Sequence, residues 1–310
     1  MRFIRKRRSR LYTLESPKFR VGCVFQVEKY RSDGTITYKG PLFNNIVLDV
    51  GLDSWSSFEL ASPISGITNW LNVGTGSSEP STGQTGLDSY TAHTTDIIDE
   101  SMTSDYTTDP VYISLWRKWE FPIGSCTGNL TELGLSHRDG YYFNRQLFRD
   151  EYGNPVTITV LDDEGLRVDG TVFVYAPLLP LEQVTGSFLL NESVTINYHL
   201  EMGFGEDEGF FPSIFDNLNR SNINLTISDS YTGYGYGIEG SVNPHSYLTG
   251  SFERIVTTTF SPGTFVGDVA RLSTNYYYKR TLCHFRLDDV IPVADNEELT
   301  IEWKMSWGRY

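Results

Sequence analysis

Alternation of apolar and polar positions, more than helical spacing, runs through this chain. Val21 to Tyr30 has strand character, Arg31-Ser32-Asp33-Gly34 supplies an Asp-Gly turn, and Thr35 to Tyr38 alternates again. This pattern predicts a β-hairpin. Another alternating stretch begins at Phe188 and extends to Leu200, whereas the best helical signal, Ser213 to Asn219, allows only about two turns. We therefore expect a mainly β fold with little helix.

Two blocks of the first half recur in the second half. Residues 121–133 (FPIGSCTGNLTEL) match residues 260–272 (FSPGTFVGDVARL), and residues 158–168 (ITVLDDEGLRV) match residues 291–301 (IPVADNEELTI). The second block predicts a strand, an acidic turn and another strand in both copies. The first copy has six more residues between its blocks, which we expect in the turn at Asp150–Pro155 because turns absorb insertions easily. The repetition predicts an internal duplication.

The domain boundary is expected where Pro177 and Pro180 interrupt the β pattern. This gives a basic N-terminal arm at 1–19, a first β domain at 20–178 and a second at 179–310. Two tandem β-sandwich domains of jelly-roll-like type are the simplest architecture. Within the first domain, the segment at about 74–108 is dense in Gly, Ser, Thr and Asp, which predicts a long surface loop.

Charge separates the arm from the rest of the chain. The formal net charge is −14, yet the first ten residues carry six cations and no acid, so the remaining chain carries −20. An acidic body argues against nucleic-acid binding over most of the surface, because phosphate contacts need a basic footprint. The arm could dock onto a partner, lie as a solvated tail or touch packaged DNA. Docking is favoured, through Arg2, Arg5, Lys6, Arg7, Arg8 and Arg10.

The cysteines and the hydropathy pattern bear on the compartment. Cys23, Cys126 and Cys283 are an odd, widely spaced set that offers neither a disulfide framework nor a zinc pattern. The residues after the basic start lack the apolar run of a signal peptide, and no window is long enough to cross a membrane. We expect assembly in a reducing cytoplasm, away from membranes.

No catalytic motif stands out in the sequence. Residues 235–240 satisfy GxGxxG without a βαβ context, and the acidic clusters at 162–164 and 206–208 fall in a predicted turn and a loop. The five histidines show no metal-ligand spacing. We predict no enzyme, no cofactor and no metal. A Tyr/Gly-rich loop offers aromatic area for glycan or protein contact, alongside ordinary loop packing, at Tyr231, Tyr234 and Tyr236.

Three short sequence elements follow one another in the first half of the chain, and their order carries a resemblance to known proteins. They are residues 44–53 (NNIVLDVGLD), residues 71–80 (LNVGTGSSEP) and residues 128–135 (GNLTELGL), followed by the aromatic and basic segment at 143–148 (FNRQLF). In this order they resemble virion structural proteins of bacteriophages, of the tail, neck or fibre-associated type. The resemblance covers about residues 40–175 and implies a virion part, without identifying which.

The expected function is that of a non-enzymatic structural component of a phage virion. It would lie in the tail, the neck or collar, or the fibre-attachment region, and dock onto other virion proteins as a homo-oligomer. The alternatives are a receptor- or carbohydrate-binding module of a tail fibre, with a host surface glycan as ligand, a capsid decoration protein, and an envelope-degrading enzyme. The first of these would use tyrosines as stacking surfaces, including residues 276–278.

Overall fold

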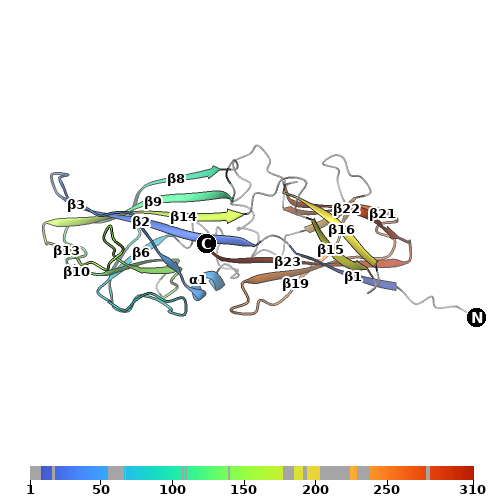
Figure 1. Cartoon of the computed structure of the whole chain (residues 1–310), viewed down its shortest axis with the longest axis horizontal. Helices are drawn as coiled ribbons and strands as arrows, with labels where there is room; N and C mark the ends of the chain where they lie inside the picture. The colour runs from blue at the N-terminus through green and yellow to red at the C-terminus, as the bar shows by residue number, and fades with distance from the viewer. Residues whose placement is uncertain are drawn as a thin grey trace, which may run out of the picture. The chain divides into compact units, whose positions relative to one another are not determined.

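The structure is a computed structural model, and it describes most of the chain (Figure 1). The described residues are 8–15, 18–54, 66, 68–105, 108, 110–138, 140–176, 185–190, 194–202, 224–228, 238–276 and 280–310. The predicted helix at Ser213–Asn219 lies outside them. In the described part, no helix is long and apolar enough to cross a membrane.

The chain divides into two compact units. The N-terminal unit contains Phe19–Ala176 together with Trp307–Tyr310 at the C-terminus. The C-terminal unit contains Pro177–Ser306 together with Met1–Lys18. Each unit therefore takes a short segment from the opposite end of the chain, an exchange that the sequence pattern did not predict.

The prediction of a mainly β protein with little helix is confirmed. In the N-terminal unit one sheet has the order β2-β14-β9-β8, with β3 and β4 paired to β2, and the other has the order β5-β12-β11-β6-β7. The bounds are β2 (Phe19–Arg31), β3 (Ile36–Lys39), β4 (Phe43–Asn44), β5 (Ile46–Val47), β6 (Trp70–Gly74), β7 (Tyr90–Thr94), β8 (Ile97–Asp105), β9 (Val111–Phe121), β11 (Glu132–Ser136), β12 (Asn144–Leu147) and β14 (Glu164–Ala176). A short pair, β10 (Gly128–Leu130) and β13 (Ile158–Val160), and a short helix, α1 (Asp49–Ser54), complete the unit.

β2 illustrates how alternation produces a sheet with one buried face. Every second residue from Phe19 to Val27 is buried, while most residues between them are not. Successive side chains of a strand point to opposite faces, so this pattern places one row in the core. The predicted hairpin is also confirmed: β2 turns into β3 through Gly34, whose φ is +83°.

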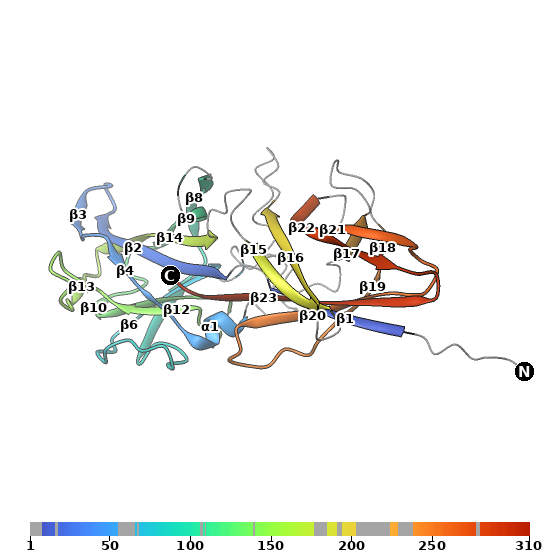
Figure 2. The same ribbon diagram turned by 45° about the vertical axis from the view of Figure 1, so that its right-hand side comes forward.

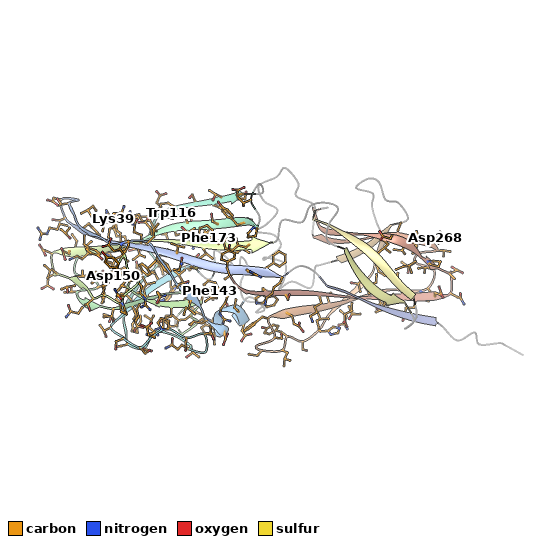
Figure 3. All side chains as sticks on the ribbon, viewed as in Figure 1. Lys39, Trp116, Phe143, Asp150, Phe173 and Asp268 are labelled. Atoms are coloured by element: carbon orange, nitrogen blue, oxygen red, sulfur yellow. The ribbon has the colours of Figure 1, made fainter. Side chains whose placement is uncertain are left out.

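The two sheets of the N-terminal unit form the layers of a β-sandwich (Figure 2). Phe43 and Phe148 meet edge to face with ring centroids 6.3 Å apart. Asn144 Nδ2 donates to Cys23 Sγ at 3.2 Å, which links the second sheet to the first. Phe143, 1% exposed, is among the largest side chains in this core (Figure 3).

The expectation of an arm over residues 1–19 is wrong for its second half. Arg8–Glu15 form β1, which pairs in parallel with β23 (Glu297–Arg309) over eight residues. Alternation within Arg8–Glu15 is compatible with a strand, but the basic residues beside it favoured a tail interpretation. Arg8 and Arg10 therefore belong to a sheet, and only residues 1–7 precede it.

The expectation of a long loop at about 74–108 is wrong in part. This segment contains β7 and β8, and β8 pairs with β9 over its whole length. A polar edge strand needs few apolar residues because it is exposed, so its composition resembles that of a loop. The remaining loop, residues 75–89, is held by polar contacts described below.

The C-terminal unit contains two sheets. One has the order β19-β20-β23 with β1 paired to β23, and the other has the order β15-β16-β22-β21-β17-β18. Their remaining bounds are β15 (Thr185–Leu190), β16 (Val194–Met202), β17 (Asn224–Ser228), β18 (Ile238–Glu239), β19 (Ser241–Pro244), β20 (Glu253–Phe260), β21 (Gly267–Tyr276) and β22 (Arg280–Val293).

Each unit contains an antiparallel strand pair, β10 with β13 in the N-terminal unit and β21 with β22 in the C-terminal unit, that is followed by an acidic turn. We call this strand pair and its turn the corner. The two corners have the same strand register. In the N-terminal unit Gly128 pairs with Val160, and in the C-terminal unit Gly267 pairs with Val293. These are corresponding positions of the repeated sequence blocks. Both glycines have positive φ, +128° and +143°.

The acidic turn of each corner is built alike. Leu161 N donates to Glu164 Oε2 at 3.1 Å, and Ala294 N donates to Glu297 Oε2 at 3.1 Å. A backbone bond in the reverse direction closes each turn, at 3.0 and 2.9 Å. Both glutamates are buried, 2% and 8% exposed.

The strand registers of the two units also agree beyond the corner, as far as the six additional residues of the first copy. Glu132 pairs with Leu147, and the corresponding Arg271 pairs with Arg286. β22 then runs on continuously, whereas β12 and β13 are separate strands with the loop Asp150–Pro155 between them. The additional residues of the first copy therefore interrupt a strand, at the place expected from the sequence.

Candidate functional site

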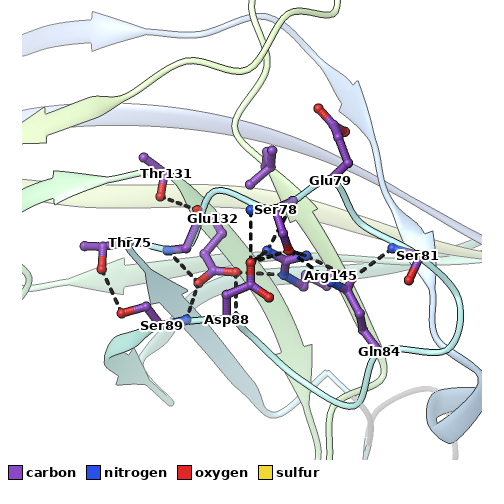
Figure 4. A network of polar contacts seen from close by, with 12 residues as sticks. Thr75, Ser78, Glu79, Ser81, Gln84, Asp88, Ser89, Thr131, Glu132 and Arg145 are labelled. Carbon is purple, nitrogen blue, oxygen red and sulfur yellow. Dashed lines mark hydrogen bonds and ion pairs between the residues drawn. The ribbon is translucent and has the colours of Figure 1, made fainter.

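The most elaborate polar arrangement among the described residues surrounds a buried ion pair on the second sheet of the N-terminal unit (Figure 4). Glu132 on β11 and Arg145 on β12 are both 0% exposed, and Arg145 Nε lies 2.7 Å from Glu132 Oε2. We call these residues and the loop 75–89 that they hold the Glu132–Arg145 network. Removing Arg145 would leave Glu132 buried without a cation, and removing Glu132 would leave Arg145 with Asp88 as its remaining acidic partner.

Glu132 accepts hydrogen bonds from backbone amides at both ends of the loop. Its Oε1 accepts from Gly76 N and from Ser89 N, each at 2.8 Å. Its Oε2 accepts from Asp88 N at 3.1 Å in addition to the arginine. Three amides and a guanidinium thus compensate the buried carboxylate, and one side chain fastens both ends of the loop.

The side chain of Arg145 bonds residues within the loop. Nη1 donates to Gln84 Oε1 at 2.9 Å, while Nη2 donates to Asp88 Oδ2 at 2.8 Å and to Ser78 O at 3.1 Å. The planar fork of the guanidinium suits such a fixed set of acceptors. Burial opposes the charge of Asp88, but hydrogen bonds from Ser78 and the charge of Arg145 outweigh it and lower the pKa of Asp88.

Backbone contacts close the base of the loop. Thr131 N donates to Gly74 O at 2.8 Å, and its hydroxyl donates to Gly76 O at 2.6 Å. Thr75 N donates to Ser89 O at 2.8 Å, while the hydroxyls of Thr75 and Ser89 bond each other at 2.9 Å. The loop is tied at its base by main-chain and side-chain bonds alike.

Glycine is required where the backbone approaches its neighbours most closely. A Cβ on Gly76 would lie 2.3 Å from Glu132 Oε1, and a Cβ on Gly51 would lie 2.1 Å from Phe143 O. Both distances are far inside van der Waals contact. These two glycines therefore have an architectural role.

The Glu132–Arg145 network is suited to holding structure. Both carboxylate oxygens of Glu132 and all three nitrogens of Arg145 are hydrogen-bonded to protein groups. A catalytic acid or base needs access to a substrate proton, and these groups face one another instead. The arrangement determines the path of the loop 75–89 across the sheet.

A second, exposed cluster lies on β6 and β7. The rings of Trp70 and His93 stack with centroids 4.1 Å apart and an interplanar angle of 15°. The Tyr90 hydroxyl and His93 Nδ1 are 2.7 Å apart, and Tyr90 is 51% exposed. Partly exposed, mutually oriented aromatic rings of this kind can present a flat surface to a ligand.

Several residues singled out in the sequence lie outside the described part of the chain. These are Arg2, Arg5, Lys6 and Arg7 of the arm, the loop residues Tyr231, Tyr234 and Tyr236, the acidic cluster at 206–208, and residues 235–237 of the GxGxxG segment. For them the sequence expectations stay as stated.

The other described acids and cysteines that could have carried chemistry are held in structural positions. Glu164 accepts from Lys29 Nζ at 2.8 Å and from the Thr37 hydroxyl at 2.7 Å. Burial raises the pKa of the Cys23 and Cys126 thiols to about 12, which leaves them protonated at neutral pH. Among the described residues, no three His, Cys, Asp or Glu side chains form a group that could hold a metal ion.

The sequence pattern does not predict the Glu132–Arg145 network as a unit, although its members belong to separate sequence motifs. The network joins three sequence elements that lie apart in the chain. They contain Gly74 and Gly76, Thr131 and Glu132, and Arg145. The useful signal was a Glu and an Arg within alternating strands, where charged residues are buried only when paired.

Comparisons with known proteins identify no relative. No protein-family model, no curated protein sequence and no solved structure matches the chain. The functional argument therefore depends on the residues themselves.

Proposed function

We propose that this chain is a non-enzymatic structural component of a bacteriophage virion, in the tail, neck or collar, or fibre-attachment region. The observation that carries the proposal is the convergence of the virion-like sequence elements on one buried, fully bonded network. Gly76, Glu132 and Arg145 come from three of these elements and bond one another. Residues used in this way serve architecture.

The repeated corners support a second part of the proposal, that the two units are duplicated sandwich domains of jelly-roll-like type. The sheet orders correspond as well: β5-β12-β11-β6-β7 in one unit matches β16-β22-β21-β17-β18 in the other, where β15 extends the sheet by one strand. Duplication gives a subunit with two similar domains, and closed assemblies repeat one subunit contact around an axis.

The proposed mechanism is docking of residues 1–7 onto neighbouring subunits. Because β1 is part of a sheet, a deletion that tests the arm must stop before Arg8. We expect a chain lacking residues 2–7 to fold, with an unchanged melting temperature, and to be missing from purified particles. Mass spectrometry of particles carrying the full-length chain should detect it in a constant ratio to other virion proteins. Its absence from those particles would contradict the proposal.

A receptor- or carbohydrate-binding module is the second candidate function, and the Trp70–His93 stack is the observation that favours it. Aromatic rings on an exposed strand suit stacking against sugar faces. Binding of host surface polysaccharide, measured by calorimetry, should be absent if the chain is purely structural. Saturable binding that Trp70→Ala removes would replace the leading proposal.

An envelope-degrading enzyme is tested with the same polysaccharide in a separate experiment. Purified chain is incubated with host polysaccharide, and chain length is measured before and after. Unchanged length is expected, whereas steady shortening with turnover would overturn the non-enzymatic assignment.

A further inference from the structure

Among the described strands, β8 comes last in the order of its sheet in the N-terminal unit, where β9 is its neighbour (Figure 1). It is nine residues long, and residues 98–103 are all exposed. Ile98 and Met102 are 48% and 47% exposed. A long exposed edge of this kind presents backbone donors and acceptors that another strand can bind.

The charge of β8 restricts which strand that can be. Asp99, Glu100 and Asp105 lie on it, and Asp96 directly precedes it. Two copies of β8 side by side would bring these acids together, which disfavours pairing of the edge with itself. A basic extended segment would instead meet complementary charge.

The two faces of β8 differ in what they offer. Glu100 bonds Arg117 at 3.0 Å on the face toward the core, and Met102 lies on the same face opposite Leu115. Asp99 alternates onto the outer face, with Thr103, whose hydroxyl bonds Ser114 at 2.7 Å. An added strand could therefore place cations against acids on both faces and an apolar side chain against Met102.

The chain itself contains a segment with this chemistry. Residues 1–7 (MRFIRKR) carry four cations and no acid, and they include Phe3 and Ile4. Seven residues are enough to pair with most of β8. The body of the same chain is acidic, which favours encounter with this segment from another copy.

We propose that β8 is the receptor for residues 1–7 of a neighbouring copy of this chain, which adds to the sheet edge as a further strand. This inference rests on the proposed function of the arm as a docking element and names its target. Main-chain hydrogen bonds supply affinity, as in other cases of strand addition, and the acids of β8 supply selectivity for a basic segment.

The test is a titration of a fluorescent peptide of residues 1–8 with the full-length chain, followed by fluorescence anisotropy. Asp99→Lys with Glu100→Gln changes the charge of β8 by three while the glutamine can still accept from Arg117. The control, Asp162→Lys with Glu151→Gln, makes the same charge change at two exposed positions of the same unit. Unchanged melting temperatures establish that both variants fold.

We expect saturable binding to the unsubstituted chain, about tenfold weaker binding to the β8 variant and an effect of less than about twofold in the control. Hydrogen exchange should show slower exchange of β8 amides when the peptide is bound. Absence of binding, equal weakening in both variants, or slowed exchange only outside β8 would each overturn the assignment.

A parallel experiment separates this inference from the proposed function. Incorporation into particles is compared for the chain lacking residues 2–7 and for the β8 variant. Loss in both supports β8 as the receptor. Loss in the deletion alone means that the arm docks elsewhere, so the β8 assignment fails and the docking function stands. Normal incorporation of both removes the arm from assembly, and both proposals fail.

Discussion

The corner of the N-terminal unit and the corner of the C-terminal unit have the same backbone and different surroundings. Gly128 and Gly267 hold the same register, and Glu164 and Glu297 accept the same turn amide. The N-terminal corner leads into the buried Glu132–Arg145 ion pair, whereas the matching positions of the C-terminal copy are Arg271 and His284, which include no acid. The strand framework is thus independent of the polar network, which serves to hold the loop 75–89.

The largest expected effect comes from breaking the ion pair. Glu132→Ala should lower the free energy of unfolding by about 3 to 5 kcal/mol, because the buried Arg145 would keep only the partly exposed Asp88 as counter-charge and three backbone amides would lose their acceptor. Chemical denaturation monitored by near-UV circular dichroism measures the loss. Arg145→Ala should cost a similar amount, and the double variant should cost less than the sum. Losses below about 1 kcal/mol would mean that the network does not hold the unit together.

Glu164 is the next strongest test, since Lys29 and Thr37 supplement its turn contact. The hydrogen bond from Lys29, with those from Thr37 and the Leu161 amide, outweighs burial and lowers the pKa of Glu164 to about 2. A lowered pKa stabilises the fold above the unfolded-state value of about 4.3, and this stability is lost as the pH falls toward about 2. Glu164→Gln should cost about 2 kcal/mol at pH 7.

The pH dependence is measured by denaturation of both proteins from pH 7 to pH 2. The difference between the wild type and Glu164→Gln should be constant down to about pH 4.5 and then shrink. A difference that stays constant to pH 2 would show that the carboxylate charge is not what stabilises this corner.

Trp307 tests the exchange of chain ends between the units. Its ring is 1% exposed, and Nε1 donates to Leu52 O at 2.9 Å. Trp307→Phe should cost about 2 kcal/mol, because the carbonyl at the end of α1 loses its buried donor. Hydrogen exchange should accelerate in β2 and α1 of the N-terminal unit. If exchange changed only in the C-terminal unit, the assignment of Trp307–Tyr310 would be wrong.

The smallest expected loss of stability comes from Gly→Ala substitutions, which should have equal effects at matching positions of the two corners. Gly124 and Gly263 occupy matching turn positions with φ of +76° and +80°. Their nearest neighbours would lie 3.4 and 3.6 Å from an added Cβ, so Gly→Ala introduces backbone strain without a clash. Each substitution should cost about 1 to 2 kcal/mol. Clearly unequal losses, measured by denaturation of each variant, would contradict the equivalence of the two corners.

Local pattern predicted much of the strand content. The hairpin at β2 and β3, the acidic turns and the position of the insertion follow from alternation, turn residues and offset, which are properties of short segments. The pairing of β1 with β23 and the placement of Trp307 did not follow, because they join residues more than 250 positions apart.

The candidate site shows the same division. Its glycines and charged residues were visible as separate motifs, but the bond between Arg145 and Glu132 depends on register between strands. The sequence of the polar edge strand β8 predicts a loop, because exposure on both faces removes the apolar alternation that marks a half-buried strand.

The most direct test of the central claim is the mass of the purified full-length chain by light scattering coupled to size exclusion, at two concentrations. A virion component that docks through its own arm is expected to give a discrete multiple of 35.2 kDa at both concentrations. That multiple should fall to a single chain when residues 2–7 are removed. A mass of one chain for the full-length protein at both concentrations would contradict the account.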